Sequence, residues 1–412
     1  MTGRLNLLAA LAWRNIWRQP QRTALSFLSI GFACVVTIFV LALQQGSYNT
    51  MRESVLRLFD GFAQIQPPGY ADDPDIRRTV ADPDALTKRA DSLATVSVST
   101  PRASAFVIVS HGPRSYGAAA IGVAPSTEAK VSVLAKTIAK GRYLTPRDSD
   151  SVVIGQALAR NLNLSVSDKL TMLGGAYDGS IAADVLTVVG IFDSGAPELD
   201  RQVIQMPLKR FQEDFALGGR ANLVALTGSR LADFQTGLPA LHRIAEEAGL
   251  VLRDWTELQP GVYQHILLDM GFSSLLYASL IAVVVFIILN TILMSVLERT
   301  REFGMLLALG MRPAQIGRMV WLEILFLTSI GVAAGIAVGA AVTYWVSKEG
   351  IVFSGFETLM RQWNMPSTFY PELNLISALT GPLLIAGAIA IAGLVPYVHV
   401  RRLNPVTAMR AA

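Results

Sequence analysis

The sequence is almost without cysteine, and it has no phosphate-binding loop for ATP. Its single cysteine, Cys34, excludes a disulfide within the chain, so a domain outside the cytoplasm would depend on its core alone. No segment matches G-x-x-x-x-G-K-[ST], so the chain does not bind ATP by that route. Any work driven by ATP would take its energy from another protein.

Patterns for catalysis and metal binding are missing as well. The sequence has neither H-E-x-x-H nor G-x-S-x-G. Its four histidines are scattered and lack ligand spacing to acids or to the cysteine. We therefore expect no catalytic, metal-binding or cofactor-binding residue in this chain, and no enzymatic activity.

Charge is scarce, and long apolar runs are abundant. Charged residues make up 16% of the 412 residues, and hydrophobic residues make up 52%. The apolar residues gather in four runs, each long enough for the ~20 helical residues that cross a bilayer. The runs predict transmembrane helices at 24–46, 272–297, 317–346 and 375–398. The first is too long for a typical signal peptide, so we predict an uncleaved anchor.

Basic residues on the short flanking segments predict the orientation. Segments 1–23 and 298–318 carry four arginines each, and the tail at 399–412 carries three. The loop at 347–374 has two basic residues against three acids. The positive-inside rule therefore predicts a multi-pass inner (plasma) membrane protein with both termini in the cytoplasm. The net charge of +4 reflects this orientation, and no motif indicates nucleic-acid binding.

The segment between the first two spans, 47–271, is predicted to be a large α+β extracytoplasmic domain. Its apolar residues change from helical spacing to alternation, and Gly and Pro mark the joints. Helical spacing persists at 46–59 and 256–271, which predicts stalk helices continuing the spans. Strands are expected at 94–98, 105–110, 117–123, 169–173, 185–192, 202–206 and 223–226, and helices at 82–93, 155–163, 207–216, 230–248 and 256–268.

Other features concern the membrane region. Leucine, tryptophan and arginine at 5–18 predict an interfacial helix. Gly331, Gly335 and Gly339 recur every four residues and predict close helix packing. Asn290 is interpreted as a hydrogen bond between helices rather than a functional polar site, and Glu323 as a residue at the cytoplasmic interface.

A short charged segment separates the second and third spans, so it lies at the membrane surface, where a cytoplasmic partner can grip it. Its charged residues can pair across an interface and fix the register of a partner. Phe303, Met305 and Leu306 offer an apolar anchor, and Gly304 and Gly310 permit close approach or a helix end. The candidate interface is Glu298, Arg299, Thr300, Arg301, Glu302, Phe303, Gly304, Met305, Leu306, Leu309 and Gly310.

One span, a large external segment and three further spans is the layout of the MacB/FtsX-like (type VII) ABC transporter permeases. E-R-T-R-E-F-G at 298–304, followed by A-L-G at 308–310, resembles the E-R-T-R-E-[IF]-G…A-L-G segment of that family. P-V-T-A-M-R at 405–410 is similar to its C-terminal P-x-x-A-L-R. Residues 141–144, 152–155 and 190–192 resemble the lipoprotein-releasing LolC/LolE branch.

The resemblance implies a permease that pairs with a second permease, identical or related, on a cytoplasmic ABC ATPase dimer. The ATPase would bind ATP and Mg, and the loop at 298–316 would seat a coupling helix in it. ATP-driven closure would then be relayed through the stalks to the external domain (mechanotransmission), with lipoproteins or another lipophilic envelope substrate moved. Membrane lipid and a periplasmic carrier or adaptor would be further partners.

Two other functions stay open. One is a MacB-like efflux pump subunit, although MacB carries its ATPase fused at the N-terminus and this sequence does not. The other is an FtsX-like signalling permease that regulates a cell-wall hydrolase, although FtsX-type external domains are usually smaller than 47–271. The loop at 174–184 is interpreted as a plain solvent loop, with a partner-docking hairpin tip as the alternative.

Overall fold

The computed structural model describes residues 2–18, 20–352, 355 and 368–402. They divide into two compact units. One comprises the described residues up to Tyr48, Ile266–Val352 and those from Thr368 onward, and the other is built from Asn49–His265. The motif expected at 405–410 and half of the loop at 347–374 lie outside the described residues. Each unit is considered by itself.

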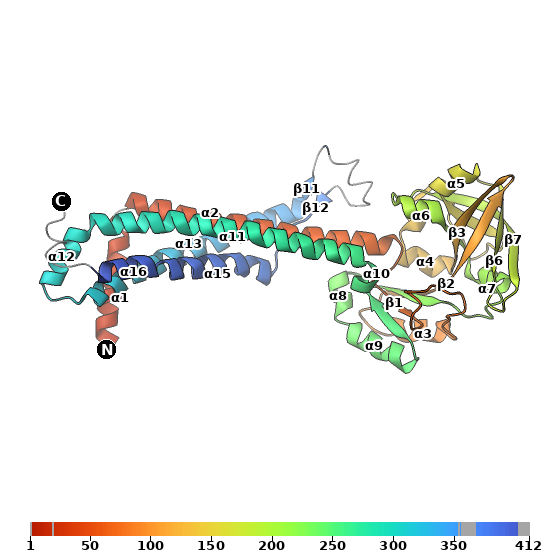
Figure 1. Cartoon of the computed structure of the whole chain (residues 1–412), viewed down its shortest axis with the longest axis horizontal. Coiled ribbons are helices and arrows are strands. Elements are labelled where there is room, and N and C mark those ends of the chain that lie inside the picture. Colours follow the sequence, from red (N-terminus) through yellow and green to blue (C-terminus); the bar gives the residue numbers. More distant parts are fainter. Residues whose placement is uncertain (1, 19, 353–354, 356–367, 403–412) are drawn as a thin grey trace. The chain divides into compact units, whose positions relative to one another are not determined.

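The first unit is helical and carries the apolar runs (Figure 1). Four of its helices are long and apolar enough to cross a membrane by length and composition: α2, α11, α13 and α15 continued by α16. α2 and α11 have 39 residues each and run past the expected span limits. The residues expected to form a stalk after the first span therefore belong, as far as Leu58, to the same continuous helix α2. The elements are α1 (Thr2–Ile16), α2 (Pro20–Leu58), α11 (Pro260–Glu298), α12 (Thr300–Ala308), α13 (Pro313–Glu349), β11 (Ile351–Val352), β12 (Thr368–Phe369), α15 (Leu375–Ala392) and α16 (Leu394–Arg401).

Glycines bring α13 close to α2. A Cβ at Gly335 would lie 2.5 Å from Cys34 Cβ, and one at Gly339 would lie 2.9 Å from Ile38 Cδ1. A Cβ at Gly331 would lie 2.9 Å from Ile30 Cβ. Only hydrogen fits at these three positions, so the small residues that recur on α13 form its contact surface for α2.

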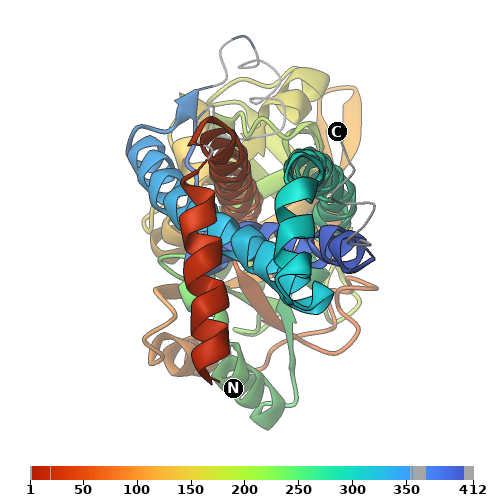
Figure 2. The ribbon, with the colours of Figure 1, turned by 90° about the vertical axis from the view of Figure 1, so that its left-hand side faces the viewer.

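α1 crosses α13 at one end of the bundle (Figure 2). The ring of Trp13 meets that of Phe326 edge to face, with 5.8 Å between centroids. Trp13 and Trp17 are 44% and 62% exposed, and Arg14 and Arg18 are exposed beside them. Exposed Trp and Arg on a helix that packs across the end of a span are typical of the headgroup layer.

The second unit is a mixed sheet with helices. Its strand order is β10-β1-β9-β2-β3-β8-β5-β7-β4, and β6 pairs with both β2 and β7. The pairs β3–β8 and β5–β7 are parallel, and the other pairs are antiparallel. The strands are β1 (Ala63–Gln66), β2 (Val98–His111), β3 (Arg114–Val123), β4 (Ile138–Gly141), β5 (Ser151–Gly155), β6 (Lys169–Gly175), β7 (Ile181–Phe192), β8 (Val203–Pro207), β9 (Leu223–Thr227) and β10 (Val251–Asp254).

Short helices cover parts of this sheet and complete two hydrophobic clusters. In the larger cluster, the rings of Phe211 and Phe215 stack with centroids 4.2 Å apart under β2, β3 and β6. The helices are α3 (Pro83–Asp91), α4 (Pro125–Val131), η1 (Leu134–Lys136), α5 (Gln156–Leu162), α6 (Pro197–Gln202), α7 (Leu208–Asp214), α8 (Leu231–Gln235), α9 (Leu238–Glu247) and α10 (Trp255–Leu258).

Some expected elements are wrong, for local reasons. The strand expected at 94–98 is a turn, and β2 begins only at Val98. The helix expected at 230–248 divides into α8 and α9 at Gly237, because Pro239 cannot lie inside a helix and instead stands in the first turn of α9. The helix at 256–268 breaks at Gln259, before Pro260 opens α11.

Candidate functional site

The charged segment after the second span folds as a separate helix, α12. Its first turn carries Glu302, whose negative charge suits a helix N-terminus. At the other end Gly310 adopts a φ of +95°, and the amide of Met311 donates to the Leu306 carbonyl at 3.0 Å. A left-handed glycine at this point ends the helix and turns the chain towards α13. The A-L-G sequence is therefore a helix stop.

The inner side of α12 is buried in the chain's own bundle. Phe303 is 1% exposed within the cluster that also holds Ile316, Val320 and Ile324, and Gly304 is buried beside it. The expected role of Phe303 as an anchor that reaches into a partner therefore needs correction. Because its ring is enclosed, it holds α12 against the spans and is not offered to another protein.

The outer side of α12 is exposed and mixes one charge with apolar groups. Arg301, Met305 and Ala308 follow one another at helical spacing, and all three are exposed. Met305 is 53% exposed, and Leu309, just beyond the helix, is 83% exposed. Arg301, Met305, Ala308 and Leu309 are called the outer face of α12 below. Leu306 lies half-buried between the two sides.

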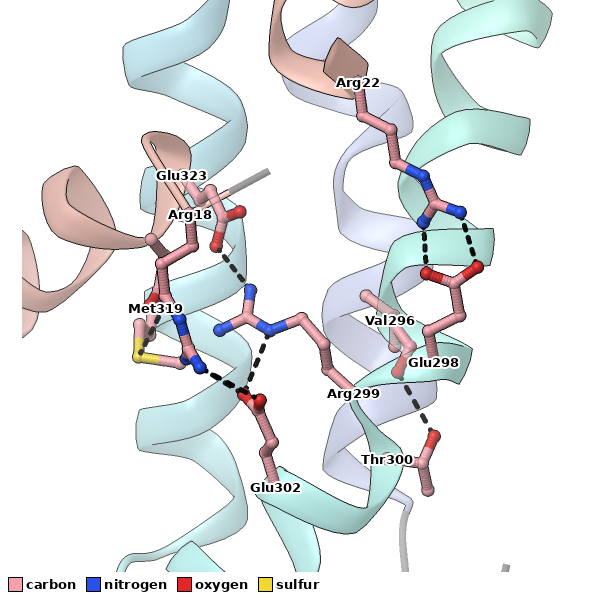
Figure 3. A network of polar contacts seen from close by, with 10 residues as sticks. Arg18, Arg22, Val296, Glu298, Arg299, Thr300, Glu302, Met319 and Glu323 are labelled. Carbon is pink, nitrogen blue, oxygen red and sulfur yellow. Dashed lines mark hydrogen bonds and ion pairs between the residues drawn. The ribbon is translucent and has the colours of Figure 1, made fainter. Parts of the chain in front are cut away.

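Ion pairs tie the segment to three other helices (Figure 3). Glu302 accepts from Arg18, just beyond α1, with two N···O distances of 3.3 Å. Glu298 at the end of α11 accepts from both terminal nitrogens of Arg22 on α2. Arg299 contacts Glu302 at 3.4 Å and Glu323 of α13 at 3.3 Å. We call these residues the ion-pair network.

The network fixes the position of α12 more than it adds stability. The Arg18 and Glu302 side chains are 61% and 41% exposed, and such pairs contribute about 0–1 kcal/mol each. The Arg299–Glu323 pair is more sheltered, at 13% and 23%, and the guanidinium of Arg299 also lies 5.3 Å from the Phe303 ring centroid. The hydroxyl of Thr300 also donates a hydrogen bond to the Val296 carbonyl of α11 at 3.2 Å.

A cavity of about 190 Å³ opens beside the network. One part of its wall is polar and the other is apolar. The wall is formed by Asn15, Arg18, Arg22, Thr23, Ser26, Thr291, Ile292, Ser295, Val296, Arg299, Glu302, Phe303, Val320, Glu323, Ile324 and Leu327.

The sequence pattern did not single out every residue here. From the sequence, Arg18 and Arg22 contributed only to the predicted orientation, and Glu323 was only placed at the membrane interface. The number of charged residues in a segment does not show which distant residue each of them pairs with. Asn290 lies on an exposed face of α11, and its side chain makes no hydrogen bond within the part of the chain that the structure describes. The interhelical hydrogen bond expected of it is therefore not made inside this bundle.

These features define a chain with four candidate membrane-crossing helices and an exposed helix between two of them, and comparison with known proteins gives the family. The model of the FtsX-like permease C-terminal domain matches residues 274–405, and that of the MacB-like periplasmic core domain matches residues 23–236, more than half of the chain. The chain belongs to the MacB/FtsX-like family of type VII ABC transporter permeases.

Individual relatives come from two groups. The lipoprotein-releasing system transmembrane protein LolC of Neisseria meningitidis is 24% identical, over 82% of this chain and 80% of its own length. The macrolide export ATP-binding/permease protein MacB of Hyphomonas neptunium is 24% identical over 97% of this chain, which spans 60% of that protein. Among solved structures, the periplasmic region of MacB from Actinobacillus actinomycetemcomitans matches half of this chain at 13% identity, with a TM-score of 0.38 over 92% of its own length.

Proposed function

We propose that this permease couples ATP hydrolysis by a cytoplasmic ABC ATPase dimer to motion of its extracytoplasmic domain, for release of lipoproteins or movement of another lipophilic envelope substrate. The ATPase binds ATP and Mg, and a second permease, identical or related, completes the assembly. Both termini and α12 face the cytoplasm. The observation that carries the proposal is the outer face of α12, which leaves an arginine and two large apolar side chains exposed opposite the buried Phe303 and Gly304.

The ion-pair network supports the coupling role. A push on α12 from a partner would act on α1, α2 and α13 through Arg18, Arg22 and Arg299, because each of these side chains is paired with an acid of the segment or of α13. A motion that alters these pairs would need little energy where they are exposed. The buried ring of Phe303 thus fixes α12 against the spans, whereas its exposed ion pairs can rearrange at little cost in energy.

The two longest helices support a relay towards the external domain. α2 is continuous from Pro20 to Leu58, and α11 from Pro260 to Glu298, so each contributes residues to both compact units. An unbroken helix transmits a displacement along its axis, which is what mechanotransmission requires. The hairpin β6–β7 exposes Leu173 and Ile181, at 47% and 75%, and a carrier or adaptor would dock there.

The test of coupling uses reversed charge and added charge on the outer face. Arg301→Glu and Leu309→Asp should each lower recovery of the ATPase with the tagged permease by at least tenfold, with membrane insertion unchanged. Arg318→Glu is the matched control, since Arg318 is also exposed near this end of the bundle but lies on α13. Equal recovery from all three variants would contradict the proposal.

The test of substrate is depletion of the permease in cells. Lipoproteins should accumulate in the inner membrane as the permease is lost. Normal lipoprotein sorting, together with increased sensitivity to an exported drug, would favour the MacB-like efflux function, which the MacB-like core-domain match also supports. Normal sorting with a cell-wall defect would favour signalling.

A further inference from the structure

The cavity beside the ion-pair network is lined by residues of that network, among them Arg18, Arg22 and Glu302, and its position suggests a ligand. Its wall joins the ends of α1, α2, α11, α12 and α13, where the apolar runs end. Trp13 and Trp17 on α1 mark this end of the bundle as the headgroup layer of one leaflet. A molecule that enters the cavity would therefore come from the membrane surface.

The wall of the cavity is divided by chemistry. Three arginines and two glutamates meet the hydroxyls of Ser26 and Ser295, neither of which has a hydrogen-bond partner among the described residues. Asn15, Thr23 and Thr291 add further polar atoms, and the apolar part of the wall includes Ile292, Val296 and Leu327. A ligand with a charged end and a hydrocarbon end satisfies both parts.

The volume restricts which part of such a ligand fits. At about 190 Å³ the cavity is many times larger than the ~10–15 Å³ that one water molecule needs. That is room for a small headgroup and the first atoms of a chain, and it excludes a whole lipid. The chains would remain in the bilayer.

The charges select a zwitterion over a simple anion. A bare phosphate would meet Glu302 and Glu323 as well as the arginines. An ethanolamine headgroup places its phosphate against guanidinium groups and its ammonium against a carboxylate, so both signs are used. Arg18 and Glu302 can re-pair because their side chains are exposed, whereas the side chains of Arg299 and Glu323 are sheltered and stay together.

We propose that this cavity binds the headgroup of a zwitterionic ethanolamine phospholipid from the adjoining leaflet. Arg18 and Arg22 hold the phosphate, Glu302 accepts from the ammonium, and Ser26 and Ser295 complete the polar contacts. A soluble phosphoethanolamine ester carries the same charges, but it leaves the apolar wall uncovered. Binding of the lipid would then change which cation pairs with Glu302, and this would change how α12 is attached to the neighbouring helices.

The test is lipid titration of the full-length, delipidated permease followed by native mass spectrometry. Wild type should retain one phosphatidylethanolamine more tightly than phosphatidylglycerol, and soluble glycerophosphoethanolamine should bind at least tenfold more weakly. Ser295→Leu fills the cavity without changing charge and should weaken the retained lipid at least tenfold. Ser279→Leu is the matched control, because Ser279 lies exposed on the same helix outside the cavity.

A second variant keeps the proposal testable if Ser295→Leu fails to fold. Glu302→Gln preserves shape and removes one carboxylate, so it should reduce the preference for phosphatidylethanolamine over phosphatidylglycerol. Equal lipid retention by the Ser295 and Ser279 variants would overturn the site. A wild-type preference for phosphatidylglycerol, or equal binding of the soluble ester, would overturn the assigned ligand. None of these readouts depends on the ATPase.

Discussion

The buried pair Arg102–Glu128 in the second unit gives a prediction whose size follows from its surroundings. The side chains are 2% and 0% exposed, and the guanidinium donates to both carboxylate oxygens at 2.9 Å. Arg102 also lies over the Phe59 ring, with 4.5 Å to the centroid, just beyond the end of α2. The pair therefore helps hold the last turn of that helix against β2 and α4.

Glu128→Gln removes one charge and deprives the buried arginine of the carboxylate to which it donates two hydrogen bonds. Breaking a buried pair from one side costs about 3–5 kcal/mol, because the remaining charge loses its compensation. Arg102 already has one nitrogen, Nη1, that is buried and makes no hydrogen bond with the described residues, so little rearrangement is available to it. At about 2–4 °C per kcal/mol for a unit of this size, the midpoint should fall by about 6–20 °C.

Scanning calorimetry of the purified full-length permease measures this midpoint. The double variant Arg102→Met with Glu128→Met removes both charges, so it should recover most of the loss. Glu247→Gln is the control, since Glu247 pairs with Arg89 at an exposed site, and it should change stability by less than about 1 kcal/mol. A fall under 2 °C for Glu128→Gln, or a double variant as unstable as the single one, would refute the reasoning.

Two further predictions concern a carboxyl pair and helix contact. Burial and the neighbouring Asp184 raise the pKa of Asp214 to about 7, so the folded state binds a proton that the unfolded state releases, and stability should fall as pH rises from 4 towards 7. Asp214→Asn should flatten that dependence in melts across this range, and an unchanged slope would contradict the assignment. Gly335→Ala should cost about 1–3 kcal/mol, because its Cβ would lie 2.5 Å from Cys34 Cβ. Gly387→Ala is the control, since nothing lies within 4 Å of its Cβ position, and equal melting of the two variants would refute close packing.

Patterns of apolar residues that extend over many positions predicted much of the architecture. Apolar runs and helical spacing indicated the long helices, and alternation indicated β2, β3, β6, β7, β8 and β9 in part. Among the described residues, six strands went unpredicted: β1, β4, β5, β10, β11 and β12. β1 is a four-residue strand, buried throughout, with the sequence A-Q-I-Q, and although it alternates, four residues are too few for alternation to mark a strand by themselves. Its identity as a strand depends on pairing with β9 and β10, which are far away in the sequence.

The candidate site shows a different limit of sequence reasoning. The pattern at 298–310 correctly suggests an amphipathic helix that ends at a glycine. It does not show whether an apolar side chain of that helix packs inside its own protein or against a partner. Phe303 enters its own bundle, and Met305 and Leu309 remain outside. The distinction has a mechanical consequence. A helix anchored by an internal aromatic ring moves with the spans when a partner pushes on its outer face, whereas a helix anchored only in the partner would separate from them. Burial of Phe303 is therefore what would let a surface contact become a movement of the membrane helices.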